Sequence, residues 1–246
     1  AEDGIRDHCV TGVQTCALPI SELLSGHRRR ALSPDHPVLR GTAQNPDVYF
    51  QGREAINPFI EAFPQHLNAS MAAFGELTGR DYSPYSYRGH PQAERIVVLM
   101  GSACGTVSET LEVLLARGER VGMVQVRLFR PFVPALFCQQ LPSSCRAVAV
   151  LDRCKEAGAS GEPLYLDVVA SLAESWAERG EGRPLPLVIG CRYGLGSKEF
   201  TPAMAKAVLD HLGARLAGHA TATTDRDRKS TRLKSSHTVI SYAVFC

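Results

Sequence analysis

"RIVVLMGSACGTVSETLEVLLARG" (residues 95–118) decides the fold, because a buried-strand pattern runs directly into a helical one. The apolar, largely β-branched run at residues 95–100 predicts a strand that is covered on both faces. Thr106 and Glu109 match a capping box, and the apolar residues that follow keep helical spacing until Gly118. We therefore expect a strand, a tight turn and an amphipathic helix.

The same strand-and-helix unit recurs three times downstream. Strands are predicted at residues 120–129, 146–152 and 185–190, and helices at residues 131–142, 161–180 and 201–215. Prolines bound the first of these helices, and Thr201 with Pro202 marks the start of the last. Four such units predict an α/β fold: a four-stranded, or slightly larger, parallel sheet with helices on both faces.

Residues 28–92 have a different pattern. Residues 47–51 ("DVYFQ") predict a strand, and residues 56–79 have a helical period that Pro64 interrupts and Gly79 ends. Residues 80–92 contain three tyrosines without a period and indicate a linker. With so few complete elements, we expect this region to be the tail of an incomplete α/β domain.

The two ends of the chain are related to each other through the genetic code. When positions that sum to 247 are paired, residues 1–21 and 226–246 can be written as opposite strands of the same codons, with Val13 and Lys234 the one exception among 21 pairs. Segments selected for folding have no reason to be antisense translations of each other. We interpret both ends as non-native segments that resemble translated sequencing adapter, and we exclude them from the fold prediction.

Without these ends the chain is electrically balanced. The ends hold six of the 27 basic and four of the 25 acidic residues, which leaves 21 of each. A zero net charge gives no indication of nucleic-acid binding. No apolar run reaches the roughly 18 residues of a membrane span, and no secretory signal is present, so we expect no membrane contact and a cytoplasmic location.

The five cysteines outside the ends show no C-x-x-C spacing; they are Cys104, Cys138, Cys145, Cys154 and Cys191. This spacing does not fit an iron–sulfur or zinc framework. We expect reduced, structural thiols and no metal site.

Ligands of an open parallel sheet bind beyond the carboxyl ends of its strands. Gly101, Ser102, Gly105 and Thr106 follow the first strand there, where free N–H groups at a helix start favour an anion. The G-x-G-x-x-G spacing and a P-loop lysine are both absent, so a simple turn is the alternative interpretation.

Two later loops carry charges of both signs. Their candidate residues are Arg153, Lys155, Arg192, Tyr193 and Lys198. One hypothesis is a charged rim that docks another domain or a phosphate-bearing cofactor, and the other is a solvated loop with weak local ion pairs. We predict no catalytic residue, because no histidine has a Ser, Cys or carboxylate partner at an informative spacing.

Four long contiguous segments of the chain are specific enough to indicate a family: "ALSPDHPVLRGTAQNPDVYFQGREAINPF" (31–59), "RIVVLMGSACGTVSETLEVLLARGERVGMVQVRLFRPF" (95–132), "AVLDRCKEAGASGEPLYLDVV" (149–169) and "GCRYGLGSKEFTPAMAKAVLD" (190–210). These segments resemble the pyruvate:ferredoxin (flavodoxin) oxidoreductase family. The resemblance covers about residues 28–215. The small departures are Cys154, Ala157, Cys191 and Gly196, where the family pattern has Thr, Pro, Gly and Ser, and we expect them in loops rather than strands.

The resemblance implies a multidomain, usually dimeric enzyme. Such enzymes use thiamine diphosphate and Mg²⁺ to decarboxylate pyruvate, pass electrons through iron–sulfur clusters to ferredoxin or flavodoxin, and form acetyl-CoA. It also implies that residues 22–88 end the pyrimidine-binding domain, that residues 89–215 form a second domain similar to the C-terminal domain of transketolases, and that residues 216–225 are a tail.

No position of this chain matches the family's activating carboxylate, its G-D-G motif or its cluster cysteines. We therefore expect the chain by itself to bind no cofactor and to be an inactive fragment, whose partners are the remaining domains of the enzyme. The alternative is a stand-alone α/β interaction module that docks a partner or an anionic ligand through residues 101–106, 152–163 and 191–200.

Overall fold

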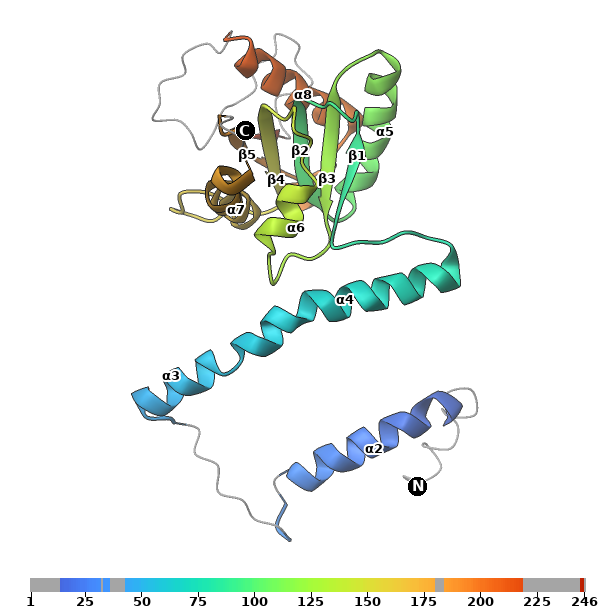
Figure 1. Cartoon of the computed structure of the whole chain (residues 1–246), viewed down its shortest axis with the longest axis vertical. Coiled ribbons are helices and arrows are strands. Elements are labelled where there is room, and N and C mark those ends of the chain that lie inside the picture. The colour runs from blue at the N-terminus through green and yellow to red at the C-terminus, as the bar shows by residue number, and fades with distance from the viewer. Residues whose placement is uncertain (1–13, 32, 36–42, 180–183, 219–243, 246) are drawn as a thin grey trace. The chain divides into compact units, whose positions relative to one another are not determined.

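The computed structural model describes residues 14–31, 33–35, 43–179, 184–218 and 244–245. The chain divides into two compact units, Ala1–Ala55 and Ile56–Cys246. The first unit holds helices α2 (Gln14–Arg30) and α3 (Pro46–Glu54), and the second holds helix α4 (Asn57–Thr78) and a sheet with its helices (Figure 1). Helix α2 begins within the segment that was excluded from the prediction as adapter-like.

The sheet of the second unit is mixed rather than purely parallel. Within the described residues its six strands have the order β1-β3-β2-β4-β5-β6. The bounds are β1 (Tyr85–Gly89), β2 (Arg95–Met100), β3 (Val121–Val126), β4 (Ala147–Asp152), β5 (Leu187–Tyr193) and β6 (Val244–Phe245). The four predicted strands, β2 to β5, are parallel as expected, whereas the edge strands β1 and β6 are antiparallel to their neighbours.

Helices cover both faces of the sheet, which confirms the predicted layers. Helices α5 (Ala103–Ala116) and α8 (Pro202–Leu216) pack on one face, and α6 (Pro134–Gln139) and α7 (Pro163–Arg179) pack on the other (Figure 1). The chain leaves β2 through α5 toward β3, but leaves β4 through α7 toward β5. The connections after the adjacent strands β2 and β4 therefore diverge, which makes this point the topological switch of the sheet.

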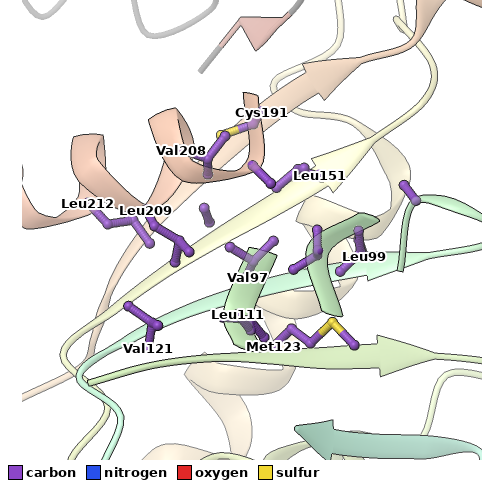
Figure 2. Close-up of a cluster of buried hydrophobic side chains, with 14 of the residues drawn as sticks. Val97, Leu99, Leu111, Val121, Met123, Leu151, Cys191, Val208, Leu209 and Leu212 are labelled. Carbon is purple, nitrogen blue, oxygen red and sulfur yellow. The ribbon is translucent and has the colours of Figure 1, made fainter. Parts of the chain in front are cut away.

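The two faces have separate apolar cores. On the first face, Leu111 of α5 and Leu209 of α8 are fully buried against Val97 and Met123 of the central strands (Figure 2). Burial of each such side chain stabilises the fold by about 1.5–3 kcal/mol. On the second face, Phe137 of α6 is buried with residues of α7 and of the same strands.

Strand β1 lies where the sequence indicated a linker. Tyr85 anchors it: the side chain is 2% exposed, the ring meets Phe132 edge-on at 5.3 Å, and the hydroxyl accepts the N–H of Val133 at 2.9 Å. The other residues of β1 are half-buried or exposed, because the strand closes one edge of the sheet. Residues 85–89 therefore lack the alternation of apolar and polar side chains by which a half-buried strand is predicted from sequence.

The predicted strand at residues 47–51 is wrong, because these residues lie in helix α3. Asn45 occupies the N-cap position and Pro46 is at the first turn, which are ordinary helix-start signals. They outweigh the β preference of Val48, Tyr49 and Phe50. A strand at residues 47–51 would also lack a neighbouring strand to pair with, since none lies among the described residues of the first unit.

One predicted helix start and one predicted helix interruption are also wrong. Helix α5 begins at Ala103 with Ser102 at the N-cap, so Thr106 lies inside the helix and the capping box is wrong. Helix α4 continues through Pro64 as one helix of 22 residues and ends at Gly79, which is left-handed with φ 68°. Thr201 does precede α8, with Pro202 at its first turn, although no side-chain cap hydrogen bond forms.

Helix α4 has no buried residues. Apolar side chains recur with helical spacing from the N-cap residue Ile56 along α4 and stay exposed; they are Ile56, Phe59, Ile60, Phe63, Phe74 and Leu77. An apolar stripe of this length normally faces a core. None of the helices in the described residues is long and apolar enough to cross a membrane.

The cysteines mostly follow the prediction. Cys104, Cys138, Cys145 and Cys154 are free thiols. Cys191 differs in two ways, since it is disulfide-bonded and lies inside β5 rather than in the loop after it.

Candidate functional site

The carboxyl ends of β2, β4 and β5 meet at one edge of the sheet, and the predicted site residues lie in the loops after them, in the first turn of α5 and at the end of β5. These loops are residues 101–102, 153–162 and 194–201. The structure places Gly101, Ser102, Arg153 and Tyr193 around one cavity there. The other predicted residues lie in three different surroundings.

Arg192 is committed to an internal ion pair. Its Nε donates to Oε1 of Glu162, and the two side chains are 14% and 4% exposed. The second oxygen of Glu162 accepts the N–H of Glu156 at 2.6 Å. Burial alone raises the pKa of Glu162, but the Glu156 N–H and the Arg192 guanidinium outweigh it and lower the pKa. The pair fastens the loop after β4 to strand β5.

Asp152, at the end of β4, holds the start of helix α7. Its two carboxylate oxygens accept the N–H groups of Leu164 at 3.0 Å and of Tyr165 at 3.1 Å. The side chain is 5% exposed, and burial raises the pKa of Asp152 while the two N–H donors offset part of that shift. Asp152 therefore satisfies two free donors of the first turn of α7.

Tyr193 is a core residue with a polar end. It is 6% exposed, its ring lies 4.8 Å from that of Phe200, and its hydroxyl donates to the carbonyl oxygen of Met100 at 3.4 Å. Burial raises its pKa. The hydroxyl links the ends of β5 and β2, which are not adjacent strands.

The start of α5 offers fewer free N–H groups than the sequence indicated. The N–H of Cys104 donates to the carbonyl of Gly101 at 3.2 Å, and that of Gly105 donates to the carbonyl of Ser102 at 3.1 Å. Thr106 lies deeper in the helix, where its carbonyl accepts the hydroxyl of Thr110 at 2.8 Å. This arrangement favours the turn interpretation over a phosphate cradle.

Three predicted cations stay at the surface. Arg153, Lys155 and Lys198 are exposed. The Nε of Arg153 donates to the carbonyl of Gly194 at 3.2 Å, which holds its side chain across the end of β5. Within the described residues, no ion pair joins Lys155 or Lys198 to a carboxylate.

The cavity at this edge has a volume of about 350 Å³. It lies between the diverging ends of β2 and β4, and its lining is Met100, Gly101, Ser102, Phe129, Leu151, Asp152, Arg153, Cys154, Pro163 and Tyr193. Gly101, Ser102 and Gly105 also line a second, more polar cavity of about 700 Å³ beside β1. The sequence-predicted residues thus divide between two cavities, the interior of helix α5 (Thr106), a buried ion pair and the open surface.

The sequence analysis did not identify the structural roles of Glu162 and Asp152. Glu162 holds the loop after β4 against β5, and Asp152 caps the start of α7. Both stand next to recognisable signals, because Glu162 precedes Pro163 at a helix start and Asp152 ends a buried strand. Their roles could not be assigned from spacing alone. Among the described residues, no group of three or more His, Cys, Asp or Glu side chains could hold a metal ion.

Comparison with known proteins relates this edge to a family. Residues 93–202 match the family described as pyruvate:ferredoxin oxidoreductase core domain II. The chain is 55% identical over 214 residues to a pyruvate-flavodoxin oxidoreductase of Trichormus variabilis, a match that covers 87% of this chain and 18% of the relative. It is 59% identical over 192 residues to a pyruvate-flavodoxin oxidoreductase of Rhodospirillum rubrum, covering 78% of this chain and 16% of the relative.

A relative with the other acceptor in its name is similar over the same length. The chain is 51% identical over 193 residues to a pyruvate:ferredoxin oxidoreductase of Moorella thermoacetica, with 78% of this chain and 16% of the relative covered. A solved 2-oxoglutarate:ferredoxin oxidoreductase from Magnetococcus marinus matches 53% of this chain and 20% of its own, at 22% identity and a TM-score of 0.35. That distant likeness locates no site. The chain spans less than a fifth of the length of these three sequence relatives.

Proposed function

Because the chain belongs to the family of pyruvate:ferredoxin and pyruvate-flavodoxin oxidoreductases, we propose that it is one part of a longer enzyme that oxidatively decarboxylates pyruvate. The whole enzyme would form acetyl-CoA and pass the electrons to ferredoxin or flavodoxin. The observation that carries this proposal is the 55% identity over 214 residues. That alignment extends well beyond residues 93–202, which match the second-domain family. The stand-alone interaction module is not favoured, since these relatives are oxidoreductases.

The cofactors of the reaction would be bound by other parts of the enzyme. The described residues do not fit Mg²⁺ or an iron–sulfur cluster, because they contain no metal-binding group and their four free cysteines do not form one. Thiamine diphosphate, Mg²⁺, the clusters and CoA therefore belong to the proposal for the whole enzyme, as do its homodimeric state and cytoplasmic location. No step of the chemistry is assigned to this chain.

The role that we assign to the chain is structural. We place residues 22–84 at the end of the pyrimidine-binding domain and the second domain from Tyr85 to residue 215, because strand β1 crosses the boundary first predicted between residues 88 and 89. The exposed apolar stripe of α4 supports this division, since it fits a helix that packs against the rest of a larger domain.

The exposed cations are the docking candidates. Lys155 and Lys198 project from two loops at the same edge of the sheet, and Arg153 lies beside them. Arg192 and Tyr193 are engaged internally, so they would shape the loops rather than touch a partner. A neighbouring domain with an acidic surface would complement the three cations.

A chimera tests the function. The aligned segment of the Rhodospirillum rubrum relative is replaced by residues 22–215 of this chain, and pyruvate- and CoA-dependent reduction of flavodoxin is measured. We expect at least about one tenth of the parent rate, because a correctly placed structural domain preserves transition-state stabilisation made elsewhere. The isolated chain should show no reduction.

Matched variants of the chimera test the docking residues. Lys155→Ala with Lys198→Ala should lower the rate or loosen assembly, whereas Lys206→Ala, an exposed cation on α8 that pairs with Asp210, should not. A folded chimera of the correct oligomeric state without pyruvate-dependent reduction would contradict the assigned function.

A further inference from the structure

The cavity of about 350 Å³ lies where an open α/β sheet places its ligands. Helix α5 leaves the end of β2 on one face of the sheet, and α7 leaves the end of β4 on the other. Because β2 and β4 are neighbours, the divergence opens a crevice at their carboxyl ends. Ligand cavities of proteins have volumes of about 300–1,000 Å³, so this one is suited to a small molecule.

The lining of the cavity is apolar on most sides. Met100 and Leu151 come from the ends of β2 and β4, Phe129 comes from the loop after β3, and Pro163 and Tyr193 complete the wall. Such a lining accepts a ring or a branched chain, and the few polar groups at the rim set the orientation of a ligand.

Arg153 is the cation of this rim, and a hydrogen bond from its Nε holds the side chain there. The bond from its Nε to the carbonyl of Gly194 leaves the two terminal guanidinium nitrogens without a hydrogen bond in the described part of the chain. Gly194 has φ 63°, and a Cβ at that position would lie 3.0 Å from the same Nε. Glycine at position 194 therefore lets the Arg153 side chain lie against the backbone. The two terminal guanidinium nitrogens are then available to a ligand.

The surrounding charges favour a monoanion over a phosphate. Asp152 also lines the cavity, and a dianion would be repelled by its carboxylate, whose oxygens are already used to cap α7. The N–H groups of Cys104 and Gly105 are bonded within the turn, so a phosphate would not find them free. One planar guanidinium matches one carboxylate with two parallel hydrogen bonds.

We propose that this cavity binds a small carboxylic acid with an apolar body about the size of one aromatic ring and a short chain. The carboxylate accepts hydrogen bonds from the terminal nitrogens of Arg153, and the apolar body contacts Met100, Phe129 and Leu151. This site goes beyond the proposed function and does not depend on it, because its test uses the chain alone.

The test is a titration of the full chain with 3-phenylpropionate, followed by backbone amide NMR. We expect saturable shifts at Gly101, Arg153 and Gly194, with an affinity in the millimolar range or tighter. Arg153→Met should weaken binding about tenfold or more, since hydrogen bonds to charged groups contribute at least that factor. Lys155→Met is the matched control, because it removes an adjacent exposed cation that does not line the cavity.

Two further measurements separate a specific site from weak apolar binding. The uncharged 3-phenylpropanamide should bind more weakly than the acid and be insensitive to Arg153→Met. The acid should also slow the labelling of the Cys154 thiol by iodoacetamide, because Cys154 lines the same cavity. Absence of saturable shifts, shifts located elsewhere, or equal affinities for Arg153→Met and Lys155→Met would each overturn the proposal.

Discussion

Replacing Arg192 with methionine leaves the Glu162 carboxylate buried without its cation. The Glu162 side chain is 4% exposed and that of Arg192 is 14% exposed, so solvent can compensate little of the loss. Removal of one partner from a buried pair costs about 3–5 kcal/mol. The N–H of Glu156 still donates to Glu162 at 2.6 Å, and we therefore expect a smaller loss, of about 2–3 kcal/mol, for Arg192→Met.

The assay is equilibrium unfolding in urea, followed by circular dichroism, for the parent, Arg192→Met, Glu162→Gln and the double variant. The double variant should lose about 1–2 kcal/mol less than the sum of the single variants, because the second change removes the stranded charge. Additive losses would show that the two side chains are not coupled.

The pH dependence provides a second check on the same pair. The pKa of Glu162 is lowered in the folded state, so its contribution is present above the unfolded carboxyl value of about 4.3 and is lost as pH falls through the lowered folded value. The penalty of Arg192→Met should therefore shrink in acid. A stability within about 0.5 kcal/mol of the parent at neutral pH would refute the reasoning, since surface substitutions have effects of that size.

Three other features give sharp predictions. Gly122→Ala should destabilise the fold by about 1–3 kcal/mol, because the new Cβ would lie 2.7 Å from Cε2 of Tyr87, and a Tyr87→Ala background should remove most of that penalty in the same urea assay. His211 has a buried Nε2 without a partner among the described residues, and burial lowers its pKa, so stability should fall as pH drops from about 7 to 5. His211→Leu should flatten that slope, and an unchanged slope would exclude His211 as its source. In native-state labelling with iodoacetamide read by mass spectrometry, Cys154 should react before Cys104, which is buried and has a pKa raised to about 11; the reverse order would contradict the described burial.

The central strands were predictable because each is a run of buried, mostly apolar residues rich in valine. Residues 147–150 read Ala-Val-Ala-Val and are covered on both faces, so the pattern of the strand needs no knowledge of its neighbours. Edge strand β1 differs, because its register comes from pairing with β3, more than thirty residues later. Local sequence could not supply that partner.

The gathering of several predicted residues at one edge of the sheet was predictable, but their contacts were not. The rule that ligands lie at the carboxyl ends of parallel strands placed Gly101, Arg153 and Tyr193 near one cavity. The partner of Arg192, however, lies thirty residues away, and only the fold brings Glu162 to it. A charged loop residue can pair with any of several residues of opposite charge, and the sequence does not indicate which of them lies closest in the fold.

The exposed apolar stripe of α4 will limit the solubility of the isolated chain. Phe59 is 76% exposed and Leu77 86% exposed, and three further large apolar side chains accompany them along the same helix. The hydrophobic effect favours burial of this apolar surface against a second copy of the chain. We therefore expect the chains to self-associate as their concentration rises, while the sheet stays folded. Light scattering, and not loss of the circular dichroism signal, will therefore mark the highest usable concentration of a preparation.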